Sequence, residues 1–242
     1  MERQAYNFLV AGEHSWWYSA RRRFVERSLM GVQKVEGPAL DFGAGFGACY
    51  ELLAQYTRDV DAFEVDTEAL EGCKKRGYRS ASDTWADLQG PYALVGAFDV
   101  IEHLQDDAQW LRALYERMRE GGTLVISVPA FQFLWSEHDV LHKHFRRYTK
   151  KTIGEALVRA GFTVVRATYW NFLLFPVALV LRLVGKGGGE ALAPSRVVHA
   201  LLNTLLASES KLVPTMSLPW GTGIIVVAQK RALDTQQNDP QS

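Results

Sequence analysis

The 242-residue chain carries 27 basic and 27 acidic side chains, so its formal net charge at neutral pH is zero. A chain without excess positive charge has no long-range attraction for nucleic acid, and we expect no nucleic-acid partner. The length fits one large α/β domain, or one such domain with an insertion.

Cysteine usage and the first residues suggest where the protein works. The two cysteines, Cys49 and Cys73, have no CxxC or zinc-like spacing, which favours a reducing compartment. The N-terminal residues, MERQAYNFLV, contain no cationic segment followed by an apolar run, as a secretory signal would. We therefore expect a cytoplasmic location.

The first half of the chain alternates predicted helices and strands. A helix is expected over residues 15–30, where the run Arg21–Arg23 forms a solvated face. The expected strands cover residues 39–41, 60–65, 78–81, 92–98 and 123–128, and helices are expected at about 48–56, 67–76 and 104–118. This alternation is typical of βαβ units in a parallel, doubly wound sheet.

The second half is less regular. An aromatic, polar segment at 131–149 follows Pro129, and a helix at 152–160 and a strand at 162–169 come next. A helical insertion or lid is expected at 171–210, before the last strand at 223–228, and residues 234–242 read as a disordered tail. The predicted fold is α/β and Rossmann-like. It has a doubly wound, mostly parallel seven-stranded sheet with helices on both faces, in a single domain over 1–233.

The stretch ALDFGAGFGACYELL, residues 39–53, gives the clearest functional signal. An apolar strand ends in Asp41, and the glycines Gly43, Gly45 and Gly47 then lead into a helical pattern. A strand, a tight glycine turn and a helix start place the backbone against a nucleotide-like cofactor. The alternative is a glycine-rich connector that binds nothing.

Two cofactors compete for this loop. The spacing Gly43-x-Gly45-x-x-Ala48, with Asp66 further on, satisfies a loose dinucleotide fingerprint and allows an NAD(P)-dependent oxidoreductase. A carboxylate at Asp41, however, would repel the pyrophosphate that a dinucleotide lays on such a turn. S-adenosylmethionine has no phosphate and brings a sulfonium and an ammonium group, so Asp41 favours the methyl donor.

The chain resembles the class I S-adenosylmethionine-dependent methyltransferases from Trp16 to Lys230. The motifs that carry this resemblance are DFGAGFG at 41–47, FEVDTEAL at 63–70, AFDVIEHL at 97–104 and REGGTLVISVPA at 119–130. AFDVIEHL is typical of the small-molecule branch, which includes ubiquinone-pathway O-methyltransferases. HDVLHKHFRRYT at 138–149 and WNFLLFP at 170–176 are similar to a bacterial subgroup thought to modify sugars or lipid-linked precursors.

The resemblance assigns a role to each cofactor residue. It implies that Asp41 and the three glycines surround the methionine part, and that Asp66 accepts hydrogen bonds from the ribose, with Glu64 as the weaker candidate. Asp83 is expected to accept from the adenine amino group, with Thr84 beside the ring. Phe98 and Asp99 are expected near the sulfonium. Asp83 is alternatively a helix cap, and His103 has either a packing or a site role.

Methyl transfer requires the protein to align the acceptor, exclude water and, for a hydroxyl acceptor, remove a proton. We expect segment 131–149 to supply the groups for this work. The catalytic candidates are His144, His138, Asp99 and Tyr148. A general base is one reading of the histidines, and a structural network with Asp139 and Arg147 is another. His138 and His142 would share a helix face, but no HExxH motif or cysteine partner supports a metal, so none is expected.

The apolar segment 172–184 contains Pro176 and Arg182 and is too short to span a bilayer. One interpretation is a lid that packs on the sheet. The other is a functional surface, either an apolar wall for a lipid-like acceptor or a peripheral membrane contact. The sequence thus predicts a methyltransferase for a small-molecule acceptor, with oxygen as the expected atom, on a lipid-linked, quinone-like or sugar-containing substrate. An NAD(P)-binding oxidoreductase and a catalytically silent S-adenosylmethionine-binding partner protein are the alternatives, and the oligomeric state is open.

Overall fold

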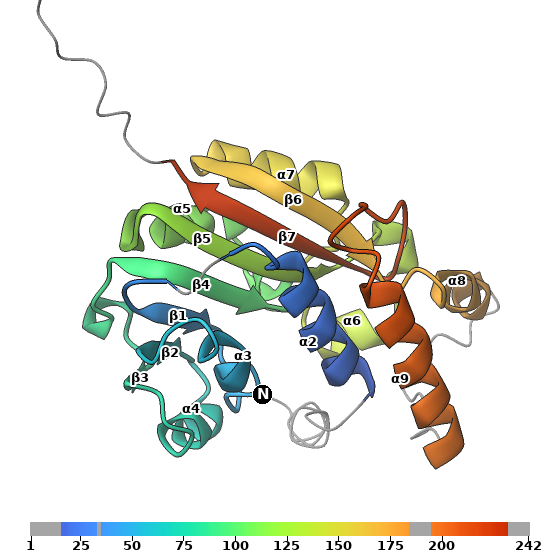
Figure 1. Cartoon of the computed structure of the whole chain (residues 1–242), viewed down its shortest axis with the longest axis horizontal. Coiled ribbons are helices and arrows are strands. Elements are labelled where there is room, and N and C mark those ends of the chain that lie inside the picture. Colours follow the sequence, from blue (N-terminus) through green and yellow to red (C-terminus); the bar gives the residue numbers. More distant parts are fainter. Residues whose placement is uncertain (1–15, 33–34, 184–194, 232–242) are drawn as a thin grey trace, which may run out of the picture.

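The computed structural model describes residues 16–32, 35–183 and 195–231, and its seven strands form one sheet (Figure 1). The strand order is β3-β2-β1-β4-β5-β7-β6. The strands are β1 (Ala39–Phe42), β2 (Val60–Phe63), β3 (Ser80–Ser82), β4 (Tyr92–Phe98), β5 (Met118–Pro129), β6 (Phe162–Trp170) and β7 (Gly223–Lys230). Strands β1 to β5 pair in parallel, and β7 runs antiparallel to both β5 and β6. The predicted mostly parallel, seven-stranded α/β fold is confirmed.

Helices cover both faces of this sheet. The α-helices are α2 (Trp16–Ser28), α3 (Tyr50–Leu53), α4 (Thr67–Lys74), α5 (Asp107–Arg117), α6 (Glu137–Leu141), α7 (Lys150–Arg159), α8 (Phe175–Leu183) and α9 (Arg196–Ser210). Short 3₁₀ helices are η1 (Trp85–Asp87), η2 (Ile101–His103) and η3 (Gln132–Leu134). In Figure 1, α2 and α9 lie side by side on one face, and α5 and α7 cover the other. The sheet is therefore doubly wound, as predicted.

The middle of the sheet holds the apolar core. Every residue of β4 is buried, as expected for a central parallel strand that is covered by helices on both faces. Because β1, β2, β3 and β4 are parallel, their carboxyl ends lie along one edge of the sheet. In open α/β sheets, this edge is where ligands bind.

Several predicted element boundaries were wrong. The helix after the glycine loop, α3, ends at Leu53 and not near Tyr56, and the third strand begins at Ser80 and not at Tyr78. Tyr78 lies outside the strand, and its hydroxyl donates to the buried carboxylate of Asp41. Strand β5 also extends back to Met118, which pairs with Tyr92 across a register shift.

The insertion before β7 contains α8 and α9, as the predicted helical segment 171–210 requires. None of residues 175–182 is buried, and Val177, Val180 and Leu181 are exposed. Within the described residues, no helix is both long and apolar enough to cross a bilayer. The ends of the predicted domain (1–233) and the predicted tail (234–242) lie outside the described residues, so these limits stay predictions.

Candidate functional site

The glycine loop continues the β1–β2 pairing past the ends of both strands. The backbone N–H groups of Gly43 and Ala44 both donate to the Phe63 carbonyl, at 2.8 and 3.1 Å. Gly43 has φ +71°, and a Cβ there would overlap the side chain of Val100. Gly45 has φ +54°, and no atom of the described residues lies within 4 Å of a Cβ built on it. The loop therefore packs on one side and is open on the other.

The acid at the carboxyl end of β2 is Glu64. The strand ends at Phe63, and the Glu64 side chain is 9% exposed. One carboxylate oxygen accepts from the Gly45 N–H at 2.7 Å, and the other accepts from the Asp66 N–H at 2.8 Å. Glu64 thus holds the glycine loop against the end of the neighbouring strand.

Asp66, the acid predicted to bind the ribose, lies two residues beyond Glu64 and has a structural role of its own. Asp66 is the N-cap of α4, where its Oδ1 accepts from the N–H groups of Glu68 and Ala69 at 3.2 and 3.1 Å. The prediction assumed a strand that reached residue 65, and the real strand is two residues shorter. The sequence did carry a signal, because an aspartate before a run of helix formers is a typical N-cap.

Asp41 lies beneath the glycine loop. Its side chain is 1% exposed and accepts a 2.6 Å hydrogen bond from the Tyr78 hydroxyl. Burial raises the pKa of Asp41 to about 6, although the Tyr78 hydrogen bond opposes this shift. The predicted cofactor residue Asp41 therefore lies near the end of β1, just before the turn that contains Gly43, Gly45 and Gly47.

Asp83 and Thr84 follow β3 on the same edge. Both side chains are exposed, and the Thr84 hydroxyl donates to Asp83 Oδ1 at 3.1 Å. The alternative that Asp83 caps a helix is not observed, because η1 begins after Thr84 and has no side-chain cap. Asp83 is thus available to a ligand at the far end of this edge.

At the end of β4, Phe98 is buried and Asp99 has an unusual positive φ of +56°. Such backbone strain clusters at functional sites. Asp99 Oδ1 accepts from the Ser127 hydroxyl at 2.8 Å, and Oδ2 accepts from Arg21 Nη1 at 2.5 Å. The carboxylate is therefore held from both sides, by β5 and by α2.

The partner of Asp99 corrects another prediction. Arg21 was expected on a solvated face, but its side chain is 6% exposed and its guanidinium lies 4.5 Å from the centre of the Tyr18 ring. Arg22 does face solvent, where it pairs with Glu26. Nothing in the local pattern distinguishes Arg21 from its neighbours, because its partner lies 78 residues further along the chain.

Asp139 organises the segment after β5. The side chain has no exposed surface, and it accepts hydrogen bonds from the Ser136 N–H, from His144 Nδ1 at 2.9 Å and from Arg147 Nε and Nη2 at 2.7 and 2.9 Å. Burial alone would raise the pKa of Asp139. The bonds from His144 and Arg147 outweigh it and hold this pKa well below its usual range.

The same segment folds back onto the residues that follow β4. The Phe145 N–H donates to the Glu102 carbonyl at 2.8 Å, and the rings of His103 and His144 meet edge to face with centroids 4.6 Å apart. Partial enclosure of the ring, together with the neighbouring His144, lowers the pKa of His103 to about 4. Burial raises the pKa of the Glu102 carboxyl well above its usual range. His103 thus lies among the site residues.

The other two catalytic candidates are placed differently. His138 packs on His142 with ring centroids 4.1 Å apart, and its ring lies 6.2 Å from that of His144. Tyr148 is buried, its hydroxyl donates to Asp107 at 2.6 Å, and burial raises the pKa of that hydroxyl. This placement argues against the predicted catalytic role of Tyr148, which instead joins the segment to the start of α5.

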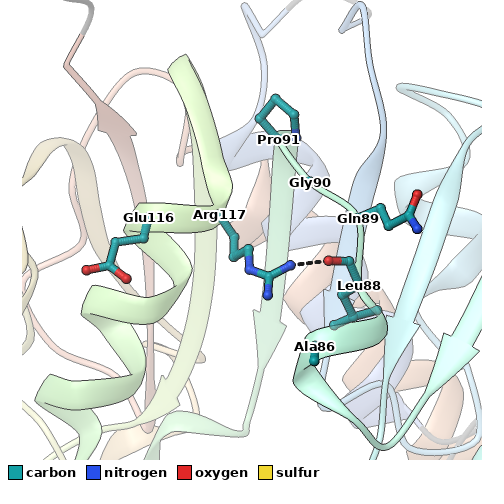
Figure 2. Close-up of a pocket in the computed structure, with 7 residues that line it drawn as sticks. All are labelled: Ala86, Leu88, Gln89, Gly90, Pro91, Glu116 and Arg117. Carbon is teal, nitrogen blue, oxygen red and sulfur yellow. Dashed lines mark hydrogen bonds between the residues drawn. The ribbon is translucent and has the colours of Figure 1, made fainter.

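An open depression of about 450 Å³ lies elsewhere on the molecule (Figure 2). It is lined by residues before β4 and at the end of α5, among them Pro91 and Arg117, and Arg117 donates to the Leu88 carbonyl. These residues mark the amino end of β4. The depression is therefore at the opposite edge of the sheet from the glycine loop.

Residues 9–167 match a family model described as a methyltransferase domain. The chain belongs to this methyltransferase family. The match spans the glycine loop, the β2 acid and the segment after β5, so it covers the site described above. The resemblance to class I S-adenosylmethionine-dependent methyltransferases that the sequence motifs carry is confirmed at the level of the family.

Curated relatives are similar over part of the chain. A probable S-adenosylmethionine-dependent methyltransferase of Mycolicibacterium smegmatis is 28% identical over 159 residues, which is 63% of this chain and 61% of the relative. A ubiquinone biosynthesis O-methyltransferase of Caulobacter sp. strain K31 is 31% identical over 98 residues, 36% of this chain and 39% of the relative. The chain thus spans less than two thirds of the length of either protein.

Solved structures share the fold at low identity. An S-adenosylmethionine-dependent methyltransferase from Clostridium acetobutylicum superimposes with a TM-score of 0.59 at 11% identity, covering 95% of this chain and 97% of that one. A sarcosine dimethylglycine methyltransferase described as putative, from Galdieria sulphuraria, gives 0.56 at 12% identity over 89% of this chain and 86% of its own. These similarities support the architecture of the sheet.

Proposed function

We propose that this chain binds S-adenosylmethionine on the glycine loop and transfers its methyl group to a small-molecule acceptor. The observation that carries the proposal is the bond between the Glu64 carboxylate and the Gly45 N–H. It brings together an open glycine turn and a buried acid at the carboxyl ends of adjacent strands. A carboxylate there accepts hydrogen bonds from the two ribose hydroxyls, while the turn admits the methionine part.

The same bond disfavours an NAD(P)-dependent oxidoreductase. A dinucleotide needs free backbone N–H groups at the turn to bind its pyrophosphate. Here the Gly45 N–H is already bonded to a carboxylate, and the buried Asp41 lies close by. A phosphate would have to displace one acid and approach another. A sulfonium donor avoids both conflicts.

The acceptor atom in this proposal is oxygen. The support is the AFDVIEHL segment, residues 97–104, together with the similarity to the Caulobacter O-methyltransferase over 98 residues. The acceptor would lie between the end of β4 and the segment that Asp139 organises.

Incubation with S-adenosylmethionine and catechol-, quinol- or sugar-containing acceptors, with detection of S-adenosylhomocysteine, tests for turnover. Cofactor binding without turnover on any of them would favour the silent partner protein.

The open side of the glycine loop gives a direct binding prediction. A Cβ at Gly45 would project into the space that the cofactor occupies in this proposal. We expect Gly45→Ala to weaken S-adenosylhomocysteine binding by about 10- to 100-fold, which corresponds to the roughly 1–3 kcal/mol that overpacking typically costs. Isothermal titration calorimetry measures the change, with NADH titrated in parallel.

The chain offers a matched control for backbone strain. Gly121 has φ +71°, no atom of the described residues lies within 4 Å of a Cβ built there, and it lies near the amino end of β5, at the opposite edge of the sheet from the loop. Gly121→Ala should lose a similar amount of thermal stability as Gly45→Ala and keep the affinity of the wild type. Unchanged affinity in a folded Gly45→Ala protein would contradict the proposed cofactor position.

We also propose that the protein is cytoplasmic and contacts membranes peripherally through segment 172–184. The support is the exposed apolar surface of α8, whose Val177 and Val180 are each 57% exposed. Changing Val177, Val180 and Leu181 together to serine should reduce co-sedimentation with phospholipid vesicles several-fold. Val158→Ser, at an equally exposed valine of α7, should leave vesicle binding unchanged. If the triple variant still binds like the wild type, α8 is a lid and not a membrane contact.

A further inference from the structure

Three potential metal ligands meet beside the candidate site. Glu102 and His103 belong to η2, directly after β4, and His144 comes from the segment after α6. One carboxylate oxygen and one nitrogen from each imidazole all lie within 4.8 Å of one another. The Phe145 N–H bond to the Glu102 carbonyl fixes the two chain segments at this separation.

The carboxylate of Glu102 is buried without a partner. Its side chain is 1% exposed, and in the described part of the chain no other residue donates a hydrogen bond to either oxygen. Burying an unpaired charged carboxylate is strongly unfavourable, so such groups bind a cation, hold hydrogen bonds or take up a proton. A cation at this position would remove the penalty.

His144 is oriented as a metal-bound histidine usually is. His144 Nδ1 is bonded to Asp139, which leaves Nε2 directed away from that carboxylate. Metal-bound histidines almost always donate their second N–H to a carboxylate or a backbone carbonyl in this way. The His103 ring meets the His144 ring edge to face, with centroids 4.6 Å apart, so it lies next to this ligand.

The charges around the cluster leave room for a cation. The two buried arginines of this region are already neutralised, Arg147 by Asp139 and Arg21 by Asp99. Both charges lower the pKa of Glu102, but among the described residues neither arginine forms an ion pair with its carboxylate. His103 is exposed, so an ion can reach the cluster from solvent.

We propose that Glu102, His103 and His144 bind a divalent first-row transition metal ion such as Zn²⁺ or Mn²⁺. Two imidazoles and one carboxylate suit such ions better than Mg²⁺ or Ca²⁺, and three protein ligands leave coordination positions open. The open positions face the region assigned to the acceptor, so they would take an oxygen-bearing molecule. This proposal replaces the expectation of no metal, which considered His138 with His142. It does not depend on methyl transfer.

The test is metal binding to the full-length, tag-free protein after chelation and dialysis. Co²⁺ is titrated with visible absorption, and Zn²⁺, Mn²⁺ and Mg²⁺ are titrated calorimetrically. We expect one ion per chain. Glu102→Gln, His103→Ala and His144→Ala should each weaken binding by about 100-fold or more, because loss of a second-shell partner alone costs about 10- to 100-fold. Asp139→Asn removes no ligand but weakens the bond that orients His144, along with the pair to Arg147, and should fall in that smaller range.

His138→Ala is the matched control, since it removes a neighbouring imidazole outside the cluster, and it should bind Co²⁺ like the wild type. Circular dichroism and S-adenosylhomocysteine titration show that each variant is folded, and they separate failure of the metal site from failure of the proposed cofactor site. The metal site is excluded if the wild type binds no stoichiometric ion. It is also excluded if Glu102→Gln retains full affinity, or if His138→Ala loses as much as His144→Ala.

Discussion

Replacing Glu64 with alanine is expected to weaken S-adenosylhomocysteine binding by about 100-fold or more. In the proposed complex the change removes the acceptor of two ribose hydrogen bonds, and hydrogen bonds to a charged group contribute about 1.5–3 kcal/mol each. It also releases the Gly45 N–H, which the carboxylate holds at 2.7 Å. Both effects act in the same direction on affinity, which calorimetric titration measures.

Asp66→Ala is the matched comparison, because this acid lies two residues away and caps α4. Its loss should cost about 1 kcal/mol of stability, the typical contribution of an N-cap, and lower the melting temperature by about 2–4 °C. Affinity should stay within about threefold of the wild type, a difference below 1 kcal/mol. The reverse result, with Asp66→Ala losing affinity and Glu64→Ala keeping it, would restore Asp66 as the ribose-binding acid.

The largest expected effect on stability comes from Asp139→Ala. The change leaves the Arg147 guanidinium buried and unpaired, and breaking a buried ion pair from one side costs about 3–5 kcal/mol. For a chain of this size, the melting temperature should fall by about 6–20 °C. Glu137→Ala, at an exposed acid in the same short helix, should change stability by no more than about 0.5 kcal/mol.

The effect of Asp139→Ala should also depend on pH. The folded protein holds the pKa of Asp139 below its usual value of 3.8, so this carboxylate stabilises the fold above that pH. The stabilisation is lost as the pH falls through the lowered folded-state pKa. The gap in melting temperature between wild type and variant should therefore be full near neutral pH and narrow in acid. A gap that stays constant down to about pH 2 would show that the ion pair is not its source.

Much of the fold was predictable because it depends on local patterns. The buried run at 92–98, the glycine turn at 43–47 and the alternation of strands with amphipathic helices are properties of neighbouring residues. Each predicted strand is present, although the third is displaced. The glycine turn indicated only a nucleotide-like cofactor, and Asp41 ahead of it favoured S-adenosylmethionine over a dinucleotide.

The sequence by itself thus determined the parallel sheet, the glycine turn and which residues lie along the carboxyl edge of that sheet. Only the tertiary structure decided which acid faces the loop, that Arg21 pairs with Asp99, and that His144 meets Glu102. These facts depend on burial and on partners that lie up to 78 residues apart in the chain. Such partners leave no mark on the pattern around either residue, because charge pairing and desolvation arise only when the packed elements bring distant segments together.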